Sequence, residues 1–507
     1  MSFNDILVAL VALVAVGFVY QQRRTNGTPL PPGPKGLPII GNLRDLAVKT
    51  LWFPASRWAK EFGSVCYLHV FGQGIVFVNT SQAAIELMDK KGSIYSDKPN
   101  MIMARDIVGL GGLMVFTGYG DQFRRQRRLM QRATGPQVVT NYQPMLEVNT
   151  RSFLRSLVKS PQNYTEHLIS YAGSKTLMIV YGHQVKSSQD TLLSLADEGT
   201  EIIKGIASGV GIWPVDIFPA LQHLPEWFPG AGFKRKAAHW RPIMQEFVDN
   251  PFQTVLDSVR NGTAIPSFCS MLLNADGSNT EEHFDIKWSA ASMYSASIDT
   301  TLTLSSLFIL AMVLNPHVLK KAQQEIDTVI GDHRLPAFSD RSSLPYIDAV
   351  MSETFRWGCP VPLSIPHRLM EDDVYDGKLI PKGSLIFANI WAMVRDEKLY
   401  PKPEEFMPER FLVDMDEQTK KRMNPRNFVF GFGRRRCPGA NLVEQSVWIL
   451  IASMIATLDI SKAVDDRGKV IEPEIIFDDN IFRLPKPFKL SMKLRSKHAE
   501  RMLSEQA

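Results

Sequence analysis

The stretch Phe430-Gly-Phe-Gly-Arg-Arg-Arg-Cys-Pro-Gly439 decides the fold that this sequence predicts. Its two internal glycines permit a tight turn, and its proline is placed to open a helix over the apolar run 440–458. Cys437 then lies at a helix N-terminus, where free amide groups and three preceding arginines favour a thiolate, so we expect a lowered thiol pKa. Such a thiolate is a soft ligand for iron. The residues alone leave open that this cysteine is a small buried apolar side chain.

The same stretch resembles the haem-binding signature of the cytochrome P450 superfamily, in which Phe is followed by Gly, Arg, Cys and Gly at fixed spacings. The matching positions are Phe430, Gly433, Arg435, Cys437 and Gly439. The resemblance implies that Cys437 is the axial ligand of a haem b iron and that the other four residues belong to the cofactor-binding loop. It also implies a mainly α fold with small β-sheets, in which haem lies between an oxygen-activation helix and the cysteine loop.

Composition narrows the class of protein. Lys and Arg number 57 against 52 Asp and Glu, a mild excess that gives no reason to expect nucleic acid as a partner. The 4 cysteines are widely spaced and contain no Cys-x-x-Cys pair, which argues against a disulfide framework and against a zinc site. A reducing, cytosol-facing domain is the simpler interpretation.

The N-terminal segment 1–25 is predicted to be a single transmembrane anchor. Its unbroken apolar run 6–20 would span about 22 Å as a helix, and two arginines follow it. A cleaved signal peptide is the main alternative, but Asp5 precedes the run where that class carries positive charge. The positive-inside tendency places the rest of the chain in the cytosol. We therefore expect an endoplasmic reticulum location, as in the microsomal members that the sequence resembles.

Proline dominates the next segment, 26–42, which should be stiff and extended and resembles the hinge of microsomal members of the family. Residues 43–507 are predicted to form one catalytic domain, with strands at 65–70, 74–78 and 379–387 and long helices elsewhere. The segment 213–233 alternates prolines with large apolar residues. The resemblance makes it a substrate-channel lid that contacts membrane, whereas its composition alone also fits a buried irregular connector.

A second motif lies in the apolar helical run that ends before Pro316. On a helix Ala296 and Thr300 share a face, with Asp299 beside them. In an arbitrary protein this pair would be a back-bonded hydroxyl and a solvated acid. The segment resembles the oxygen-activation motif of the family, which implies that Asp299 and Thr300 relay protons to bound dioxygen. Ser297 stands where the family usually has glycine, so the helix distortion that admits water would need another origin.

Further motifs follow in the order of the family. Glu353 and Arg356 are three residues apart on a predicted helix, and with Arg410 they resemble a structural Glu-Arg-Arg cluster that assembles the haem pocket. Arg127, Arg368 and Arg435 fall at positions that the resemblance assigns to the haem propionates. The alternative for the 124–128 arginine cluster is a solvated basic face.

No hydrolase motif and no nicotinamide-binding glycine motif occurs in the sequence, so electrons should come from another protein. The resemblance implies an NADPH-cytochrome P450 reductase, with cytochrome b5 as a second candidate donor. Basic residues around the cysteine loop are expected to form its docking face: Lys420, Lys421, Arg422, Arg426, Arg434 and Arg436.

The expected function is a haem-thiolate monooxygenase that inserts one atom of dioxygen into a hydrophobic small molecule, such as a terpenoid or aromatic compound of fungal secondary metabolism. Substrate contacts are expected from 101–116, 202–218, the face around Ala296, and 361–365. Two alternatives remain open: a haem-thiolate isomerase or dehydratase that needs no reductase, and a non-enzymatic haem sensor or electron carrier. Members of the first class often lack the acid and alcohol that Asp299 and Thr300 supply.

Overall fold

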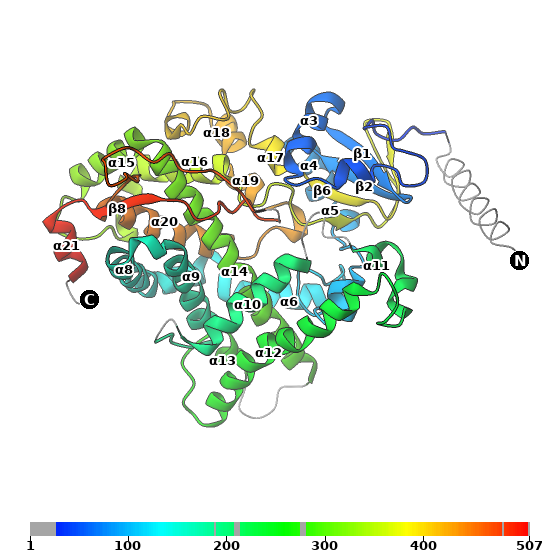
Figure 1. Cartoon of the computed structure of the whole chain (residues 1–507), viewed down its shortest axis with the longest axis horizontal. Coiled ribbons are helices and arrows are strands. Elements are labelled where there is room, and N and C mark those ends of the chain that lie inside the picture. The colour runs from blue at the N-terminus through cyan, green and yellow to red at the C-terminus, as the bar shows by residue number, and fades with distance from the viewer. Residues whose placement is uncertain (1–26, 187–188, 207–212, 274–279, 479–480, 505–507) are drawn as a thin grey trace, which may run out of the picture.

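The computed structural model describes residues 27–186, 189–206, 213–273, 280–478 and 481–504. Its fold is mainly α-helical, with β1 (Val65–Val70), β2 (Gln73–Val78) and β6 (Leu385–Ala388) at one end and β8 (Leu490–Leu494) at the other (Figure 1). The predicted anchor 1–25 lies outside the described residues. The longer helices are α3 (Trp52–Phe62), α6 (Asp121–Thr134), α8 (Gln143–Lys159), α9 (Tyr164–Tyr181), α10 (Thr191–Ile206), α12 (Gly232–Arg260), α14 (Thr280–Leu314), α15 (Pro316–Val329), α16 (Pro345–Gly358) and α20 (Ala440–Thr457).

Short helices also occur between and after these elements. They are α2 (Leu43–Leu46), α4 (Ser81–Ala84), α5 (Gly92–Tyr95), α7 (Pro136–Val139), α11 (Pro214–Ile217), α13 (Phe268–Leu272), α17 (Ile390–Met393), α18 (Glu417–Met423), α19 (Arg426–Val429) and α21 (Lys497–Ser504). Single 3-10 turns include η5 (Pro219–His223), η7 (Pro408–Phe411) and η8 (Gly433–Arg435).

The largest sheet has the strand order β1-β2-β6-β3: β1 (Val65–Val70), β2 (Gln73–Val78), β6 (Leu385–Ala388) and β3 (His367–Arg368). Two-stranded sheets pair β4 (Asp373–Tyr375) with β5 (Lys378–Ile380), and β7 (Leu458–Lys462) with β8 (Leu490–Leu494). The predicted strands 65–70 and 74–78 are confirmed. The single strand predicted at 379–387 is wrong, because Pro381 and the left-handed Gly383 (φ +85°) make a turn that sends its halves into different sheets.

Helix α14 runs through the centre of the molecule. It has 35 residues, about 52 Å at helical rise, and almost every side chain from Ile298 onward is buried. Its apolar core contacts include α9, α16 and α20, which join it in the main hydrophobic cluster. By length and composition α14 and α20 could also cross a membrane, but their apolar windows are 83% and 67% buried inside the protein. We therefore assign both as core helices.

The proline-rich segment packs on the β region. Pro29 accepts a hydrogen bond from the amide of Leu379, and Pro32 accepts one from Tyr67. A side chain at Gly33 would begin 1.9 Å from the Tyr67 carbonyl oxygen, so only glycine fits that contact. Residues 28–36 are thus extended and held along β1 and β5. Residues 37–41 are not, because the backbone turns back there and Leu37 and Gly41 bond to each other.

The segment 213–233 forms α11, η5 and a loop before α12 begins. Its aromatic side chains are exposed to solvent: the exposed fraction is 77% for Trp227, 45% for Phe218 and 41% for Phe228. A buried connector is therefore the wrong interpretation of this segment. Phe218 packs edge-on against Phe71 at the tip of the β1–β2 hairpin, with ring centroids 5.2 Å apart.

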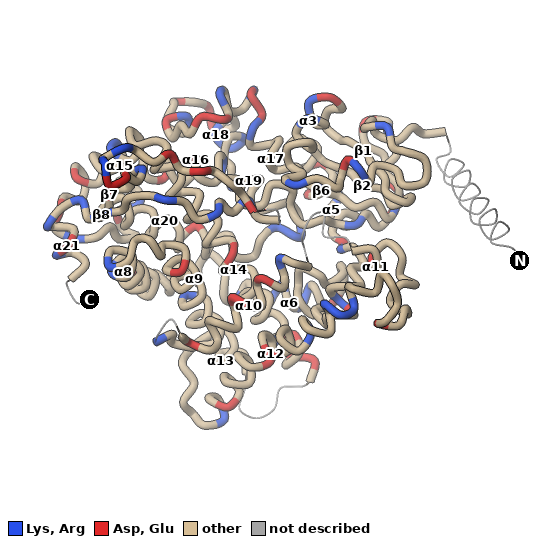
Figure 2. Tube along the Cα trace, in the orientation of Figure 1, with Lys and Arg blue, Asp and Glu red and all other residues tan. Residues whose placement is uncertain are grey.

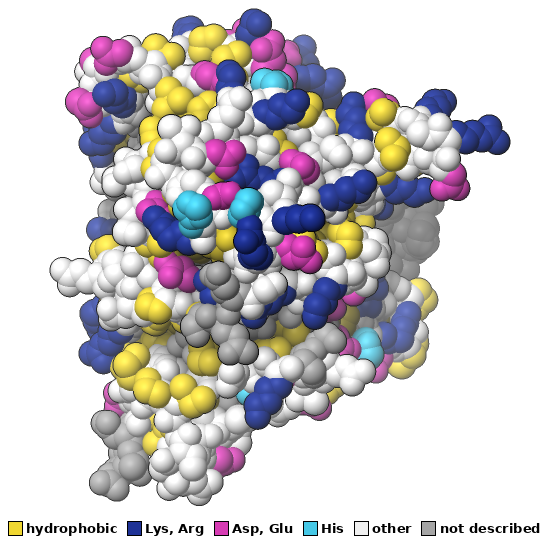
Figure 3. Space-filling view, turned by 90° about the vertical axis from the view of Figure 1, so that its left-hand side faces the viewer, with side chains coloured by type: hydrophobic (Ala, Val, Ile, Leu, Met, Phe, Trp, Pro, Cys, Tyr) yellow, Lys and Arg dark blue, Asp and Glu magenta, His cyan; other side chains and the backbone are white. Residues whose placement is uncertain are grey.

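Charged residues are spread over the described surface without one dominant sign (Figure 2). The face that carries α21 and α15 shows Lys and Arg side chains interspersed with acidic and apolar ones (Figure 3). The charges on this face form no continuous basic track.

Candidate functional site

Cys437 lies in the loop between α19 and α20, and a backbone hydrogen bond joins the two ends of this loop. The Cys437 amide donates to the Phe430 carbonyl oxygen at 2.8 Å, and Gly431 and Gly433 adopt left-handed conformations (φ +73° and +56°) that allow this turn. A side chain at Gly433 would begin 2.1 Å from the Met88 carbonyl oxygen. Helix α20 begins at Ala440, so the cysteine precedes the helix N-terminus as expected.

Burial raises the pKa of the Cys437 thiol, although amide hydrogen bonds from Gly439 and Ala440 and the charges of Arg127 and Arg436 oppose that rise. The expectation of a lowered pKa is therefore wrong for the protein chain by itself. Of the three adjacent arginines, only Arg436 lies among the groups that lower it. A bound metal ion would lower the pKa of the Cys437 thiol, since a thiol that coordinates a metal is deprotonated.

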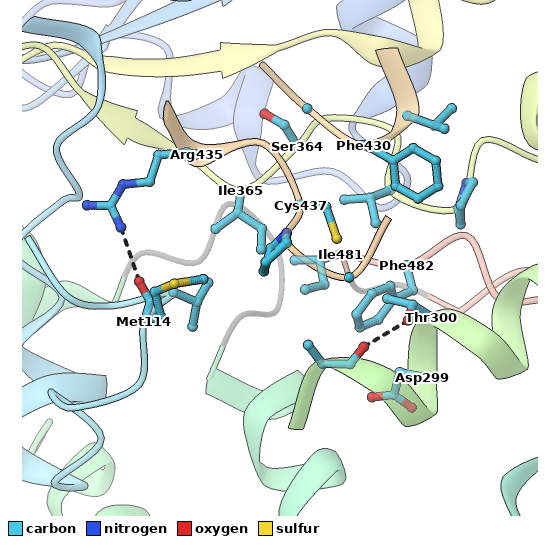
Figure 4. Close-up of a pocket in the computed structure, with 18 of the residues that line it drawn as sticks. Met114, Asp299, Thr300, Ser364, Ile365, Phe430, Arg435, Cys437, Ile481 and Phe482 are labelled. Atoms are coloured by element: carbon cyan, nitrogen blue, oxygen red, sulfur yellow. Dashed lines mark hydrogen bonds between the residues drawn. The ribbon is translucent and has the colours of Figure 1, made fainter. Parts of the chain in front are cut away.

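A cavity of about 400 Å³ opens in front of this sulfur. Figure 4 shows Cys437 on one side of it and Thr300 and Phe482 on the other. The wall is largely apolar and includes parts of the expected contact segments: Met101, Met114, Val115, Phe116, Ile203 and residues 361–365. Ile481 and Phe482 from the C-terminal part of the chain also line it, which the sequence analysis missed.

Helix α14 presents Thr300 to the cavity. The Thr300 hydroxyl donates to the Ala296 carbonyl oxygen at 2.8 Å, and α14 remains α-helical through this turn. No local distortion replaces the missing glycine at 297. Instead, Ser297 Oγ lies 2.6 Å from Thr176 Oγ1 on α9, which ties the two helices together.

Asp299 is buried and engaged in an ion pair that the sequence did not indicate. Its carboxylate lies 2.9 Å from Lys204 Nζ on α10, and Lys204 also contacts Glu201 at 2.6 Å. Burial raises the pKa of Asp299; Lys204 opposes this rise, whereas Glu201 and Asp197 add to it. The acid is therefore held in the cavity wall by the neighbouring helix.

The structure brings Glu353, Arg356 and Arg410 together in a fully enclosed cluster. Glu353 accepts from Arg356 through both oxygens at 2.7 Å, and from Arg410 Nε at 3.2 Å. All three side chains are buried, and the arginines complete their bonds on backbone carbonyls of the 394–405 region. The cluster fastens that loop to α16, next to the cysteine loop.

Three cations line another part of the cavity: Lys98 is buried, whereas Arg127 and Arg435 are half-buried. Arg127 Nη1 is enclosed without a hydrogen-bond partner among the described residues. Lys98, which the sequence analysis missed, is 5% exposed, and its partners in the described part of the chain are the Ile365 and Pro366 carbonyl oxygens. Arg435 donates to the carbonyls of Ser96, Met114 and Thr117. Burial lowers the pKa of each of these cations, a cost that an anion bound among them would offset.

Arg368 does not belong to this group. Its guanidinium pairs with Asp97 at 2.5 Å, is 45% exposed and does not line the cavity. His367 does line it, with Nδ1 2.8 Å from the Tyr95 carbonyl oxygen. Successive residues of a strand face opposite sides, so β3 directs His367 inward and Arg368 outward.

The comparisons with known proteins agree with this geometry. The family model "Cytochrome P450" matches residues 31–492. The chain belongs to the cytochrome P450 family. It is 40% identical to cytochrome P450 monooxygenase claR of Ampulloclitocybe clavipes over 99% of this chain and 92% of that protein. It is 38% identical to claT of the same fungus, over 95% and 94% of the two chains. Cytochrome P450 monooxygenase 136 of Postia placenta is 38% identical, over 97% and 93%.

P450 membership makes the protein a monooxygenase and implies haem iron held by a cysteine thiolate. The residues present fit that group. Among the described residues, Cys437 is the one thiol that lines the cavity, a side chain at Gly439 would begin 3.9 Å from its sulfur, and the enclosed Arg127 Nη1 has no hydrogen-bond partner. Arg127, Lys98 and Arg435 would hold haem carboxylates, while Cys437 would hold the metal.

Proposed function

We propose that this P450 inserts one atom of dioxygen into a hydrophobic small molecule of fungal secondary metabolism, using electrons from an NADPH-dependent reductase. One observation carries the proposal: the Cys437 thiol faces, across an apolar cavity, a helix that presents the Thr300 hydroxyl and keeps the Asp299 carboxyl beside it. An isomerase, a dehydratase or a haem sensor has no need of an acid and an alcohol at this place.

The bound haem would supply the oxygen-activating chemistry. The chain's own residues supply position, charge and protons. Cys437 would hold the metal from the loop before α20, and Arg127, Lys98 and Arg435 would neutralise haem carboxylates. His367 lines the cavity where the sequence analysis expected Arg368.

Proton delivery is assigned to Thr300 and Asp299. The Thr300 hydroxyl is held by the Ala296 carbonyl oxygen and faces the cavity, so it can pass a proton to a polar atom there. Asp299 can resupply Thr300 only when its carboxyl exchanges the Lys204 contact for a proton or a water molecule. The apolar wall keeps other water out of the reaction space.

The test combines the purified protein with a fungal P450 reductase, NADPH and isotopically labelled dioxygen, followed by mass spectrometry on terpenoid and aromatic candidates. Label in the product supports monooxygenation. A product that forms equally well without dioxygen and reductase would favour the isomerase or dehydratase alternative. Thr300→Ser is the matched variant, because it retains the hydroxyl, whereas Thr300→Val removes it and should divert reducing equivalents to peroxide.

We infer an endoplasmic reticulum membrane location with the catalytic domain in the cytosol. Support comes from the apolar run 6–20 and from exposed apolar side chains at Phe71, Phe218 and Trp227. Cell fractionation of the full chain and of a variant that lacks residues 1–25 tests this. Equal recovery of both in the membrane fraction would contradict a dominant anchor.

The reductase is assigned to the surface around the cysteine loop. Part of the predicted basic group is already neutralised there, since Arg426 pairs with Glu444 and Lys420 with Glu417. Lys421 and Arg422 are exposed at the end of α18 and remain the better candidates for contact with an acidic flavoprotein. Charge reversal at these two positions should raise the reductase concentration needed for half-maximal turnover, and added salt should reduce the difference.

A further inference from the structure

Lys175 is a buried cation in the cavity wall that the proposed reaction does not use. It lies on α9, is 1% exposed, and lines the same cavity as Cys437. Its Nζ lies 3.1 Å from Ser446 Oγ and 3.4 Å from Thr301 Oγ1. Thr301 follows Thr300 on α14, and Ser446 lies on α20, the helix that leads away from the cysteine loop.

Among the described residues, no carboxylate pairs with this ammonium. Its partners on α14 and α20 are neutral hydroxyls, and the titratable neighbour on α9 is Tyr171, whose ring centroid lies 5.7 Å from Nζ. Burial raises the pKa of Tyr171 to about 12, so that side chain is neutral. A buried lysine without a carboxylate is unusual, because taking an ammonium out of water is costly unless another group repays that cost.

We propose that the Lys175 ammonium raises the reduction potential of the haem iron, and that the neutral Lys175 amine takes up a proton when the iron is reduced. The proposal rests on the haem-thiolate assignment. Lys175 stands between α14 and α20, the two helices that bring Thr300 and Cys437 to the cavity, so its charge lies beside the space that haem would fill. Lys98, Arg127 and Arg435 come from other elements and would hold the haem carboxylates.

The physical reason is electrostatic. A fixed positive charge favours the iron state that carries one less positive charge, and the low polarity of the interior leaves that interaction poorly screened. Reduction adds one electron to iron from an external donor, a flavoprotein in turnover or dithionite in the test. Because the coupling is reciprocal, that electron makes the neutral amine bind a proton from solvent more tightly.

The titration range follows from burial, which lowers the pKa of Lys175 to about 8. Below that pH the ammonium is present in both iron states and raises the potential fully. Above it the amine is neutral in the ferric protein, and reduction must be accompanied by proton uptake. The wild-type potential should therefore fall with rising pH around pH 8, in addition to any dependence shared by other groups.

The experiment is a spectroelectrochemical titration of purified, haem-loaded protein without substrate or reductase, from about pH 6 to 10. Lys175→Met removes the charge at similar volume, and Lys175→Arg retains it. Lys287→Met is the matched control, because Lys287 lies on α14 itself but pairs with Asp249 and does not line the cavity. Haem binding in each variant is first verified from the reduced carbon monoxide spectrum.

Lys175→Met should have a lower potential than wild type at pH 7 and a flatter pH dependence near pH 8, whereas Lys175→Arg and Lys287→Met should keep the wild-type potential at pH 7. Equal potentials and equal slopes in Lys175→Met and wild type would overturn the proposal. If Lys175→Met does not retain haem, Lys175→Gln replaces it in the same titration. The wild-type protein gives a second test, because a wild-type potential that is constant from pH 7 to 9 would overturn the proposal. Failure of the monooxygenation assay would leave these potentials unaffected.

Discussion

Replacement of Glu353 by glutamine tests whether one buried carboxylate holds the structure around the haem pocket. The side chain is fully buried, and its two oxygens accept from Arg356, Arg410 and the amide of Met407. Both arginines otherwise bond to backbone carbonyls, so a single negative charge compensates two enclosed positive charges. Glu353→Gln retains the shape but removes the charge and directs an amide N–H at a guanidinium.

The expected loss can be estimated from the type of contact. Removal of one partner from a buried ion pair costs about 3–5 kcal/mol, and a native domain has about 5–15 kcal/mol in total. The variant should therefore lose haem at a much lower urea concentration than wild type. The reduced carbon monoxide spectrum, followed through a urea series, measures this loss directly at the pocket that the cluster supports.

Glu409→Gln is the matched control for this experiment. Glu409 is in the same 3-10 turn as Arg410, but it pairs with Lys321 at the surface, where both side chains are substantially exposed. Such a pair contributes about 0–1 kcal/mol, so the control midpoint should stay near that of wild type. Coincident midpoints for Glu353→Gln and Glu409→Gln would refute the argument that burial makes the first carboxylate essential.

Three shorter predictions concern the cavity itself. Cys437→Ser should abolish the red-shifted Soret band of the reduced carbon monoxide complex, and an unchanged spectrum would remove Cys437 as ligand. His367→Ala should weaken haem retention more than Arg368→Ala does, because only the histidine lines the cavity; the reverse order in a haem-transfer assay would contradict this. Lys204→Met should raise the pKa of Asp299 further, since the ammonium opposes the effect of burial. The carboxyl then ionises only at higher pH, so the pH profile of coupled turnover should shift to the alkaline side, and an unshifted profile would argue against Asp299 as a proton carrier.

The sequence predicted the features that depend on short segments. The haem loop needs Gly431 and Gly433 at positions where the backbone turns left-handed, and these glycines are visible in the sequence itself. The family, the mainly helical fold and strands β1 and β2 follow from such local signals. The strand predicted at 379–387 was wrong because the apolar pattern continues across Pro381 and Gly383. These two residues form a turn, which the apolar pattern does not reveal.

Features that depend on which way a side chain points were harder to predict. The motif Pro-His-Arg contains two possible cavity residues, and an arginine is the more obvious partner for an anion. Only the two-residue strand β3 shows that His367 faces the cavity while Arg368 turns outward to Asp97. Lys98 was missed for a related reason, because a lysine in a loop is normally solvated and nothing in the sequence indicates its burial.

The Asp299–Lys204 pair shows how tertiary packing changes the meaning of a motif. From the sequence, Asp299 is an acid next to a hydroxyl on one helix, and that helix alone would determine its availability for proton transfer. In the structure its charge is compensated from α10, and the residue before Lys204, Ile203, lines the substrate cavity. Any displacement of α10 that makes room for a ligand must therefore also change the distance between the ammonium and the carboxylate. The proton supply and the shape of the cavity are thus set by the same helix.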